Sequence, residues 1–256
     1  MPKANDYLGI LIFALLLTLV VYLAFAIQTR QTEIINKLNL RGASYLSPEQ
    51  YLAFAKLENV EEFDKLNVSL IKDRLEKHPY VRKADVKLDE KGNAEINITE
   101  KKIDAFLNCG SRQYLVSDKY EALPLLSFTR KLNVPVISNP DDCENIKNYK
   151  NLLKINDVKT AFKLMETVKV LNKDLLRNVS EIDLREGKDI VVYLSGINYP
   201  VVLGRENEVR KMIYFSKFWN KLKGKEINQV VDYIDLRFDK HLYIGFTGAF
   251  DEENGV

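Results

Sequence analysis

The stretch Leu75-Glu76-Lys77-His78-Pro79-Tyr80-Val81-Arg82-Lys83-Ala84-Asp85-Val86 joins the end of a predicted helix to the start of a predicted strand. Pro79 ends the helix, because proline lacks a backbone N–H and its ring clashes with the turn before it. The residues that follow predict a strand with one break in its apolar alternation, namely Val81, Ala84, Val86 and Leu88. This helix-to-strand junction therefore fixes the type of element predicted on each side of Pro79.

Residues 30–102 predict the order strand, helix, helix, strand, strand around this junction. A short strand at 34–40 comes first, and a helix then begins at Ser47-Pro48-Glu49-Gln50, with serine as N-cap and glutamine at the third position. A second helix, 68–77, leads into Pro79. The turn Asp89–Asn93 and the alternating residues Ala94–Glu100 predict a hairpin whose last strand is half-buried.

Residues 103–247 predict a second α+β domain, which we expect to be built on an antiparallel sheet with two longer helices. The helices are expected from about Val158 to Arg177 and from Glu206 to Leu222. Strands are expected at Ile103–Leu107, Gln113–Ser117, Val134–Ile137, Val179–Arg185, Asp189–Leu194, Tyr199–Leu203, Val230–Phe238 and Leu242–Phe246.

The tetrapeptide Ile182-Asp183-Leu184-Arg185 recurs as Ile234-Asp235-Leu236-Arg237. In a strand, the isoleucine and leucine of each copy would face one side and the aspartate and arginine the other. Two interpretations are open: a coincidence between similar strands, or two strands that occupy related positions in one sheet. The similarity does not extend further, so a full sequence repeat is not indicated.

Residues 8–27 carry no charge, and as a helix they would span about 30 Å, the hydrocarbon thickness of a bilayer. We expect one transmembrane helix at 8–27, after a cytoplasmic tail at 1–7. The alternative is a cleaved signal peptide, because Ala24-Phe25-Ala26 has the small-x-small form of a cleavage site. The long apolar run and the weakly basic head favour the anchor. The acidic C-terminal tail, 248–256, is expected to be frayed.

The composition excludes several classes of protein. Lys and Arg number 38 against 36 Asp and Glu, which argues against a nucleic-acid-coating protein, and 46% hydrophobic residues exclude intrinsic disorder. Two Cys and two His are too few for a structural zinc site. His78 and His241 sit in no catalytic motif, and the acidic run Asp141–Glu144 suits a solvated loop. No catalytic residue, cofactor or metal ligand is therefore predicted.

The two cysteines, Cys109 and Cys143, both lie in the part of the chain that follows the apolar run. In an oxidising compartment they could form a disulfide, and the sequence leaves both states open, because geometry decides the pairing.

Two features suggest contact with a partner. The predicted helix 206–222 has a second apolar stripe, containing Tyr214, Phe215, Phe218 and Leu222, where an ordinary surface helix needs one. The last predicted strand, Leu242–Phe246, is apolar, and a strand at a chain end is often a sheet edge. Two interpretations of the helix are open: it is enclosed between sheet and loops, or its second apolar face contacts a partner. The terminal strand predicts strand addition by a partner segment.

These pieces resemble the bacterial cell division protein family FtsQ, also called DivIB. Residues 75–86 look like the Leu-x-x-x-Pro-x-Val-x-x-Ala-x-Val signature of its POTRA domain, and the order and spacing of further segments agree. Those segments are Gly92–Ile98, Glu100–Ile103, Tyr114–Asp118, Leu123-Pro124, Val202–Gly204 and Ile234–Phe238. The middle of the chain looks closest to the Bacteroidetes branch of the family.

The resemblance implies a non-enzymatic scaffold with a POTRA domain at 30–102 and a β domain at 103–247. Such proteins are single-pass type II proteins of the inner membrane, with their C-terminal domains in the periplasm at the division septum. They bind the coiled-coil division proteins FtsB and FtsL, among other septal proteins, and help control septal peptidoglycan synthesis. By match, the partner contacts are expected at Arg237, Phe238, Leu242, Tyr243, Ile244, Gly245, Phe246, Tyr214, Phe218 and Trp219.

Two other classes remain as alternatives. A POTRA-containing envelope assembly or secretion component would continue into a long barrel sequence, which is not found here. An anchored envelope enzyme would need a cluster of titratable residues, and none is found in the sequence.

Overall fold

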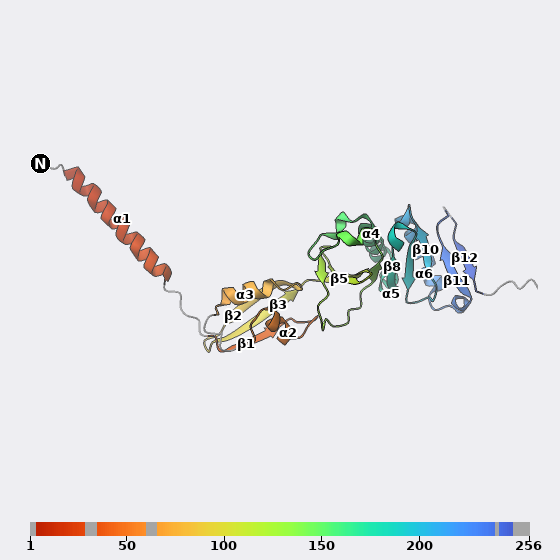
Figure 1. Cartoon of the computed structure of the whole chain (residues 1–256), viewed down its shortest axis with the longest axis horizontal. Coiled ribbons are helices and arrows are strands. Elements are labelled where there is room, and N and C mark those ends of the chain that lie inside the picture. Colours follow the sequence, from red (N-terminus) through yellow and green to blue (C-terminus); the bar gives the residue numbers. More distant parts are fainter. Residues whose placement is uncertain (1–3, 29–34, 60–65, 239–240, 248–256) are drawn as a thin grey trace, which may run out of the picture.

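The computed structural model describes residues 4–28, 35–59, 66–238 and 241–247, and Figure 1 shows their arrangement. A helix, α1 (Ala4–Gln28), precedes a small domain and a larger domain that lie end to end. The expected frayed tail, 248–256, and the first three residues of the expected cytoplasmic tail lie outside the described residues.

The side chains of α1 are described for residues 11–23, so the expected transmembrane span 8–27 extends past them at both ends. In the part of the chain that the structure describes, none of the helices combines the length and apolar character needed to cross a membrane.

The small domain has the element order expected from the sequence. It consists of β1 (Lys37–Arg41), α2 (Pro48–Phe54), α3 (Val68–Glu76), β2 (Val81–Leu88) and β3 (Asn93–Glu100). The strand order is β1-β3-β2, with β1 parallel and β2 antiparallel to the central β3. Because β1 runs parallel to β3, the chain must cross the sheet between β1 and β2, and α2 and α3 provide that connection.

Local interactions explain where these elements begin. The predicted capping box is confirmed: Ser47 Oγ accepts from the Gln50 N–H, and the Gln50 side chain accepts from the Ser47 N–H. Asp89 forms the predicted hairpin turn, since its carboxylate accepts from the N–H groups of Lys91 and Asn93 at 2.8 Å each. The break in the alternation of β2 is a register shift between Val81 and Lys83.

The larger domain is built on one nine-stranded sheet of order β12-β11-β10-β9-β8-β7-β4-β5-β6. Its strands are β4 (Ile103–Cys109), β5 (Arg112–Ser117), β6 (Ala122–Pro124), β7 (Val136–Ser138), β8 (Val179–Asp183), β9 (Ile190–Leu194), β10 (Val201–Gly204), β11 (Val231–Asp235) and β12 (Tyr243–Phe246). Its α-helices are α4 (Asn156–Leu171), α5 (Lys173–Asn178) and α6 (Glu208–Leu222), and short 3-10 turns are η2 (Cys143–Asn145), η3 (Leu152–Lys154), η4 (Arg185–Gly187) and η5 (Glu226–Gln229).

The expectation of an antiparallel sheet was wrong, because this sheet is mixed. Three strand pairs are parallel: β4 with β7, β7 with β8, and β10 with β11. Helices α4 and α5 connect β7 to β8, and α6 connects β10 to β11. A helix between two neighbouring strands returns the chain to the same end of the sheet, so each of these connections makes a parallel pair.

The single helix expected from Val158 to Arg177 was also wrong. It is two helices, because Asn172 leaves the helical conformation (φ −152°, ψ 95°) and caps α5 with its side chain. The Asn172 Oδ1 accepts from the N–H groups of Asp174 and Leu175. Such local side-chain bonds compete with the helix ladder and favour a new N-terminus.

Two apolar cores meet on opposite faces of β4 and β5. One face belongs to the core that also contains side chains of α4, and there Ala105, Leu107, Tyr114 and Val116 are buried. On the other face Phe106 and Leu115 pack with the core of the small domain. The Tyr80 hydroxyl ties the two domains, because it accepts from the Leu126 N–H at 2.9 Å and donates to the Pro124 carbonyl at 3.1 Å.

Cys109 and Cys143 form a disulfide in the structure, with their Cα atoms 5.6 Å apart. The bond joins the end of β4 to η2. It encloses β5, β6 and β7 in one covalent loop.

Removing this disulfide is expected to destabilise the protein. The bond closes a loop with a sequence separation of 34, which corresponds to about 4 kcal/mol of lost chain entropy in the unfolded state. Urea unfolding should show this decrease for Cys109→Ala/Cys143→Ala and for the reduced wild type. Alkylation of both cysteines in the unreduced, denatured wild type would contradict the pairing.

His78 is buried between the rings of Tyr51, Phe54 and Tyr80, at centroid distances of 4.5, 4.5 and 5.3 Å. Its Nδ1 accepts from the Tyr80 N–H at 3.1 Å, while Nε2 has no hydrogen-bond partner among the described residues. Burial, aided by the charge of Lys101, lowers the pKa of His78 from 6.5 to about 4. The folded protein therefore holds His78 neutral where the unfolded chain would protonate it.

Acid is expected to destabilise the protein through His78. Between pH 6.5 and 4 the unfolded chain binds a proton that the folded chain does not, so stability falls as the pH falls. His78→Asn keeps an acceptor for the Tyr80 N–H and cannot titrate. Its free energy of unfolding, measured in urea from pH 7 to 4, should depend less on pH than that of the wild type, and parallel profiles would contradict this assignment.

Candidate functional site

The two edges of the nine-stranded sheet differ in how their backbone groups are used. At β6, the Tyr149 N–H donates to the Ala122 carbonyl at 2.6 Å, and the Ala122 N–H donates to the Lys150 carbonyl at 3.0 Å. The segment around Tyr149 thus covers that edge. At the other end β12 is the terminal strand, and β11 is its one strand partner among the described residues.

The direction of the β12 backbone groups follows from the neighbouring strands. The N–H groups of Ile234 and Leu236 donate to β10 at 3.0 and 2.8 Å, so the groups of Tyr233 and Asp235 face β12. Their partners in β12 are Gly245 and Tyr243. Because backbone groups alternate along a strand, the N–H and C=O of Ile244 point away from β11, towards the open edge.

The side chains of β12 make this edge apolar on both faces. Ile244 packs against the core of the larger domain, whereas Tyr243 and Phe246 are 51% and 54% exposed. The Tyr243 ring contacts the ring of Phe238 at a centroid distance of 5.1 Å. Gly245 is required here, since a Cβ atom would lie 2.3 Å from the ring of Tyr233, which crosses over it.

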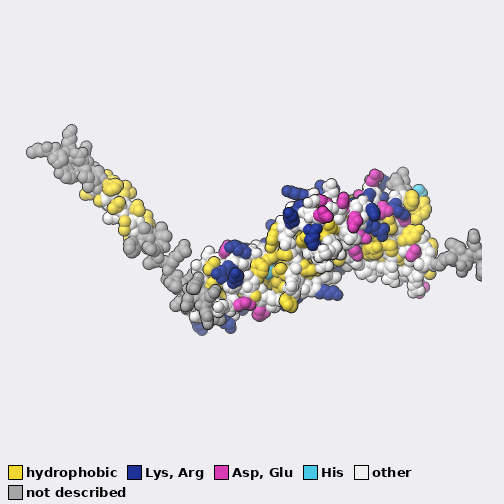
Figure 2. All heavy atoms as spheres, viewed as in Figure 1, with side chains coloured by type: hydrophobic (Ala, Val, Ile, Leu, Met, Phe, Trp, Pro, Cys, Tyr) yellow, Lys and Arg dark blue, Asp and Glu magenta, His cyan; other side chains and the backbone are white. Residues whose placement is uncertain are grey.

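A groove of about 320 Å³ lies beside the start of β12, between α6 and the chain that follows β11. Its lining is basic and aromatic: Asn207, Arg210, Lys211, Ile213, Tyr214, Lys217, Leu236, Phe238 and His241. Arg210 and Lys217 have no ion pair with any residue that the structure describes. Figure 2 shows apolar side chains gathered at the β11–β12 end of the molecule, near Lys and Arg side chains.

Most of the predicted contact residues are brought together by the fold, with one correction. Phe238, Tyr214 and the residues of β12 surround the groove and edge, and Phe218 lies beside Tyr214 with a centroid distance of 5.1 Å. Trp219 was wrongly placed among them. It is fully buried in the core, and its indole N–H donates to Asp174 at 2.9 Å, so it cannot reach a partner.

Arg237 is held by the protein itself. Its guanidinium binds both carboxylate oxygens of Asp235 and donates to Asp189 at 3.0 Å. Burial raises the pKa of Asp235, but the hydrogen bonds from Arg237 outweigh it and leave that pKa below its ordinary value. Arg237 therefore positions the chain that leads to Phe238.

The sequence did not lead to Tyr233, Arg210 or Lys217 as residues of this site. A signal was present for two of them, because Arg210 and Lys217 lie on the same side of the predicted helix 206–222.

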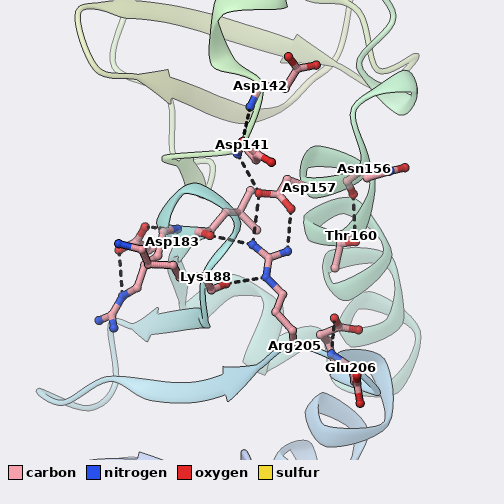
Figure 3. A network of polar contacts seen from close by, with 12 residues as sticks. Asp141, Asp142, Asn156, Asp157, Thr160, Asp183, Lys188, Arg205 and Glu206 are labelled. Carbon is pink, nitrogen blue, oxygen red and sulfur yellow. Dashed lines mark hydrogen bonds and ion pairs between the residues drawn. The ribbon is translucent and has the colours of Figure 1, made fainter.

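Arg205 positions the N-terminus of α6 and is shown in Figure 3. It donates to both carboxylate oxygens of Asp157, which is 8% exposed, at 2.6 and 3.2 Å. It also donates to the carbonyls of Leu184 and Lys188, at 2.8 and 2.5 Å. Because Asp157 belongs to α4, this network fixes α6, and with it the groove, against the rest of the domain.

The structure offers no catalytic constellation among the residues it describes. His78 is enclosed in the small domain, and His241 lies in the groove at the other end. No group of three or more His, Cys, Asp or Glu in the described ranges could hold a metal ion. A hollow lined by Asp141 and Asp142 also contains Asp157, but Asp157 is already neutralised by Arg205.

Breaking the Arg205–Asp157 pair is expected to lower the free energy of unfolding by about 2 kcal/mol, because Asp157→Ala removes the charged acceptor of a half-buried arginine. The double variant Asp157→Leu/Arg205→Met removes both charges and should recover much of that loss. Urea unfolding followed by fluorescence of the single tryptophan, Trp219, measures both. Equal losses in the two variants would show that the ion pair is not the cause.

The comparisons with known proteins agree with this architecture. Residues 105–237 match the family described as "Cell division protein FtsQ/DivIB, C-terminal". The chain is 24% identical over 193 residues to "Cell division protein FtsQ" of Geobacter sp. (strain M21), covering 75% of this chain and 69% of that protein. It is also 24% identical over 177 residues to "Cell division protein FtsQ" of Koribacter versatilis (strain Ellin345), covering 68% of this chain and 49% of that protein. The family match covers more than half of the chain, which therefore belongs to the FtsQ/DivIB cell division protein family.

Proposed function

We propose that the protein is a non-enzymatic scaffold of the division septum, which binds FtsB-like and FtsL-like coiled-coil proteins and helps control septal peptidoglycan synthesis. The observation that carries this proposal is the open, uncharged edge of β12 at the end of the sheet. Family membership supports a role in cell division.

Strand addition is the binding mode that suits this edge. A partner segment beside β12 would pair with the backbone groups of Ile244, and main-chain bonds of this kind provide affinity. Specificity would come from side chains that meet the exposed Tyr243 and the groove next to it. Arg210 and Lys217 favour a partner with acidic side chains at that end of its segment.

We further propose that residues 8–27 anchor the chain in the inner membrane as a single-pass type II protein. The described apolar side chains of α1 are 48% to 70% exposed, so the domains do not bury them. The two domains would lie in the periplasm, an oxidising compartment that suits the Cys109–Cys143 disulfide.

Within this arrangement, residues 30–102 would be the POTRA domain and would serve recruitment to the septum. The element order and the strand order β1-β3-β2 support this assignment. The alternative is an envelope assembly or secretion component. It is less favoured because the domain that follows residues 30–102 matches the FtsQ/DivIB family.

Ile244→Pro is expected to abolish partner binding, because it removes the outward N–H of the edge strand and leaves the β11–β12 pairs of Tyr243 and Gly245 intact. The measurement is a pull-down of the full chain in detergent with FtsB and FtsL of the same organism. We expect a loss of about tenfold or more in affinity.

Ile244→Val is the matched control, since it keeps the backbone donor and changes the side chain by one methylene. Circular dichroism and thermal unfolding establish that both variants fold. Retained binding by a folded Ile244→Pro variant would overturn strand addition at β12, and absence of binding by the wild type would overturn the proposed partners.

A further inference from the structure

The outer sides of α4 and α6 form one basic surface. The two helices contact each other, and both bury their apolar sides in the core of the larger domain. Their opposite sides are therefore exposed together. We call this surface the helical face, and its exposed residues at helical spacing include Lys159, Lys163, Val170, Arg210, Lys217 and Lys221.

The carboxylates of the two helices do not neutralise this surface. In α4, Glu166 is paired with Lys169 at 3.0 Å, and Asp157 is buried and bound to Arg205. In α6, Glu208 is the first residue of the helix and lies off the basic stripe. The cations of the helical face have no ion pair with any residue that the structure describes. A chain with a net charge of only +2 thus concentrates positive charge on one surface.

Apolar side chains lie among these cations. At the C-terminal end of α4, Val170 is 83% exposed and Leu171 is 50% exposed. On α6, the 38% exposed Tyr214 lies between Arg210 and Lys217 in the same stripe. Exposed apolar and aromatic side chains beside cations on a helix surface are typical of contact with a membrane interface.

We propose that the helical face lies against the anionic surface of the bilayer in which the chain is anchored. The lysine side chains reach the level of the lipid phosphate groups, and Val170 enters the interface. This inference rests on the proposed anchor at 8–27. The anchor keeps the domains at a high local concentration near the bilayer, so contacts that are individually weak are enough to hold the face there.

A lipid surface suits the helical face better than a protein partner does. The cations are mostly lysines, a residue type that is depleted in protein–protein interfaces, where arginine is enriched. Clusters of lysine next to a membrane anchor instead bind anionic headgroups. Lys159, Lys163 and Val170 do not line the groove beside β12, so the α4 part of the face is separate from the proposed partner site.

The test is quenching of tryptophan fluorescence by brominated phosphatidylcholine, with the full chain in vesicles that contain or lack phosphatidylglycerol. Val170→Trp places a reporter on the helical face, while the single native tryptophan, Trp219, is fully buried and provides the background. We expect quenching of the reporter in vesicles with phosphatidylglycerol, and its loss without this lipid or in high salt, which screens the lysine charges.

Phe128→Trp is the matched control for the reporter. Phe128 is 82% exposed, and its neighbour Leu126 packs against the core of the small domain, on the other face of β4 and β5 from α4. A tryptophan at this position should not be quenched in either kind of vesicle.

Charge reversal tests the lysines in the chain that carries the Val170→Trp reporter. Lys159→Glu/Lys163→Glu should lower the ratio of docked to undocked chains by at least about 25-fold, roughly fivefold for each lysine charge removed. Lys91→Glu/Lys131→Glu makes the same change in net charge in the turn before β3 and in the segment before β7, and should leave the quenching intact.

Quenching that survives Lys159→Glu/Lys163→Glu, or that is equal for the Phe128→Trp control, would overturn the proposal. Loss of FtsB and FtsL binding by the same double variant in detergent would assign the face to a protein partner and overturn it as well. Failure of the wild type to float with the vesicles would overturn the anchor and this inference together. An unquenched reporter in a chain that floats and binds FtsB and FtsL would overturn this inference alone.

Discussion

Strands β4 and β5 carry apolar side chains on both faces, and both domains pack on them. Leu107 and Val116 belong to the core beneath α4 and α6, while Phe106 and Leu115 belong to the core of the small domain. Strands β4 and β5 therefore contribute side chains to both cores. Buried apolar contacts hold the two domains together, in addition to the chain that connects them. The ion pairs Arg82–Asp118 and Lys101–Glu121 lie along the same junction. As a result β12 is held at the opposite end of the two-domain unit from β1 (Figure 1).

Local features of the fold could be predicted from the sequence, because each rests on a few neighbouring residues. The capping box at Ser47, the turn at Asp89 and the end of α3 before Pro79 are of this kind. Asn172 was missed because Leu171 and Leu175 keep the helical spacing across the break. The parallel strand pairs were missed although a strand, a long helix and a strand in sequence already indicate a crossover.

The candidate site was predictable in position but not in detail. The apolar strand Leu242–Phe246 was predicted to be an edge because the last strand of a domain often is one. Trp219 was included through the family resemblance and not through periodicity, and a resemblance between motifs does not show which side chains of α6 are buried. The recurring tetrapeptide has the same local structure in both copies: Asp183 and Asp235 each accept from the backbone N–H of the arginine two residues later, at 3.0 and 2.8 Å. The interpretation of two strands with related positions in one sheet is the one that the pairing supports.

The other sheet edges of the described chain show why β12 differs. β1 contains Lys37 and Arg41, and β2 contains Arg82, Lys83, Asp85 and Lys87, so both edges of the small sheet carry charge. The β6 edge is covered by the segment around Tyr149. Charged or covered edges resist pairing with other strands, whereas Tyr243–Phe246 carries no charge and is not covered by any segment that the structure describes. The ring of Tyr233 lies over Gly245 and leaves no room for a side chain at that position, so the edge carries no charge there. Under the proposed function a partner strand binds at β12, which accounts for an edge that lacks the charge carried by β1 and β2.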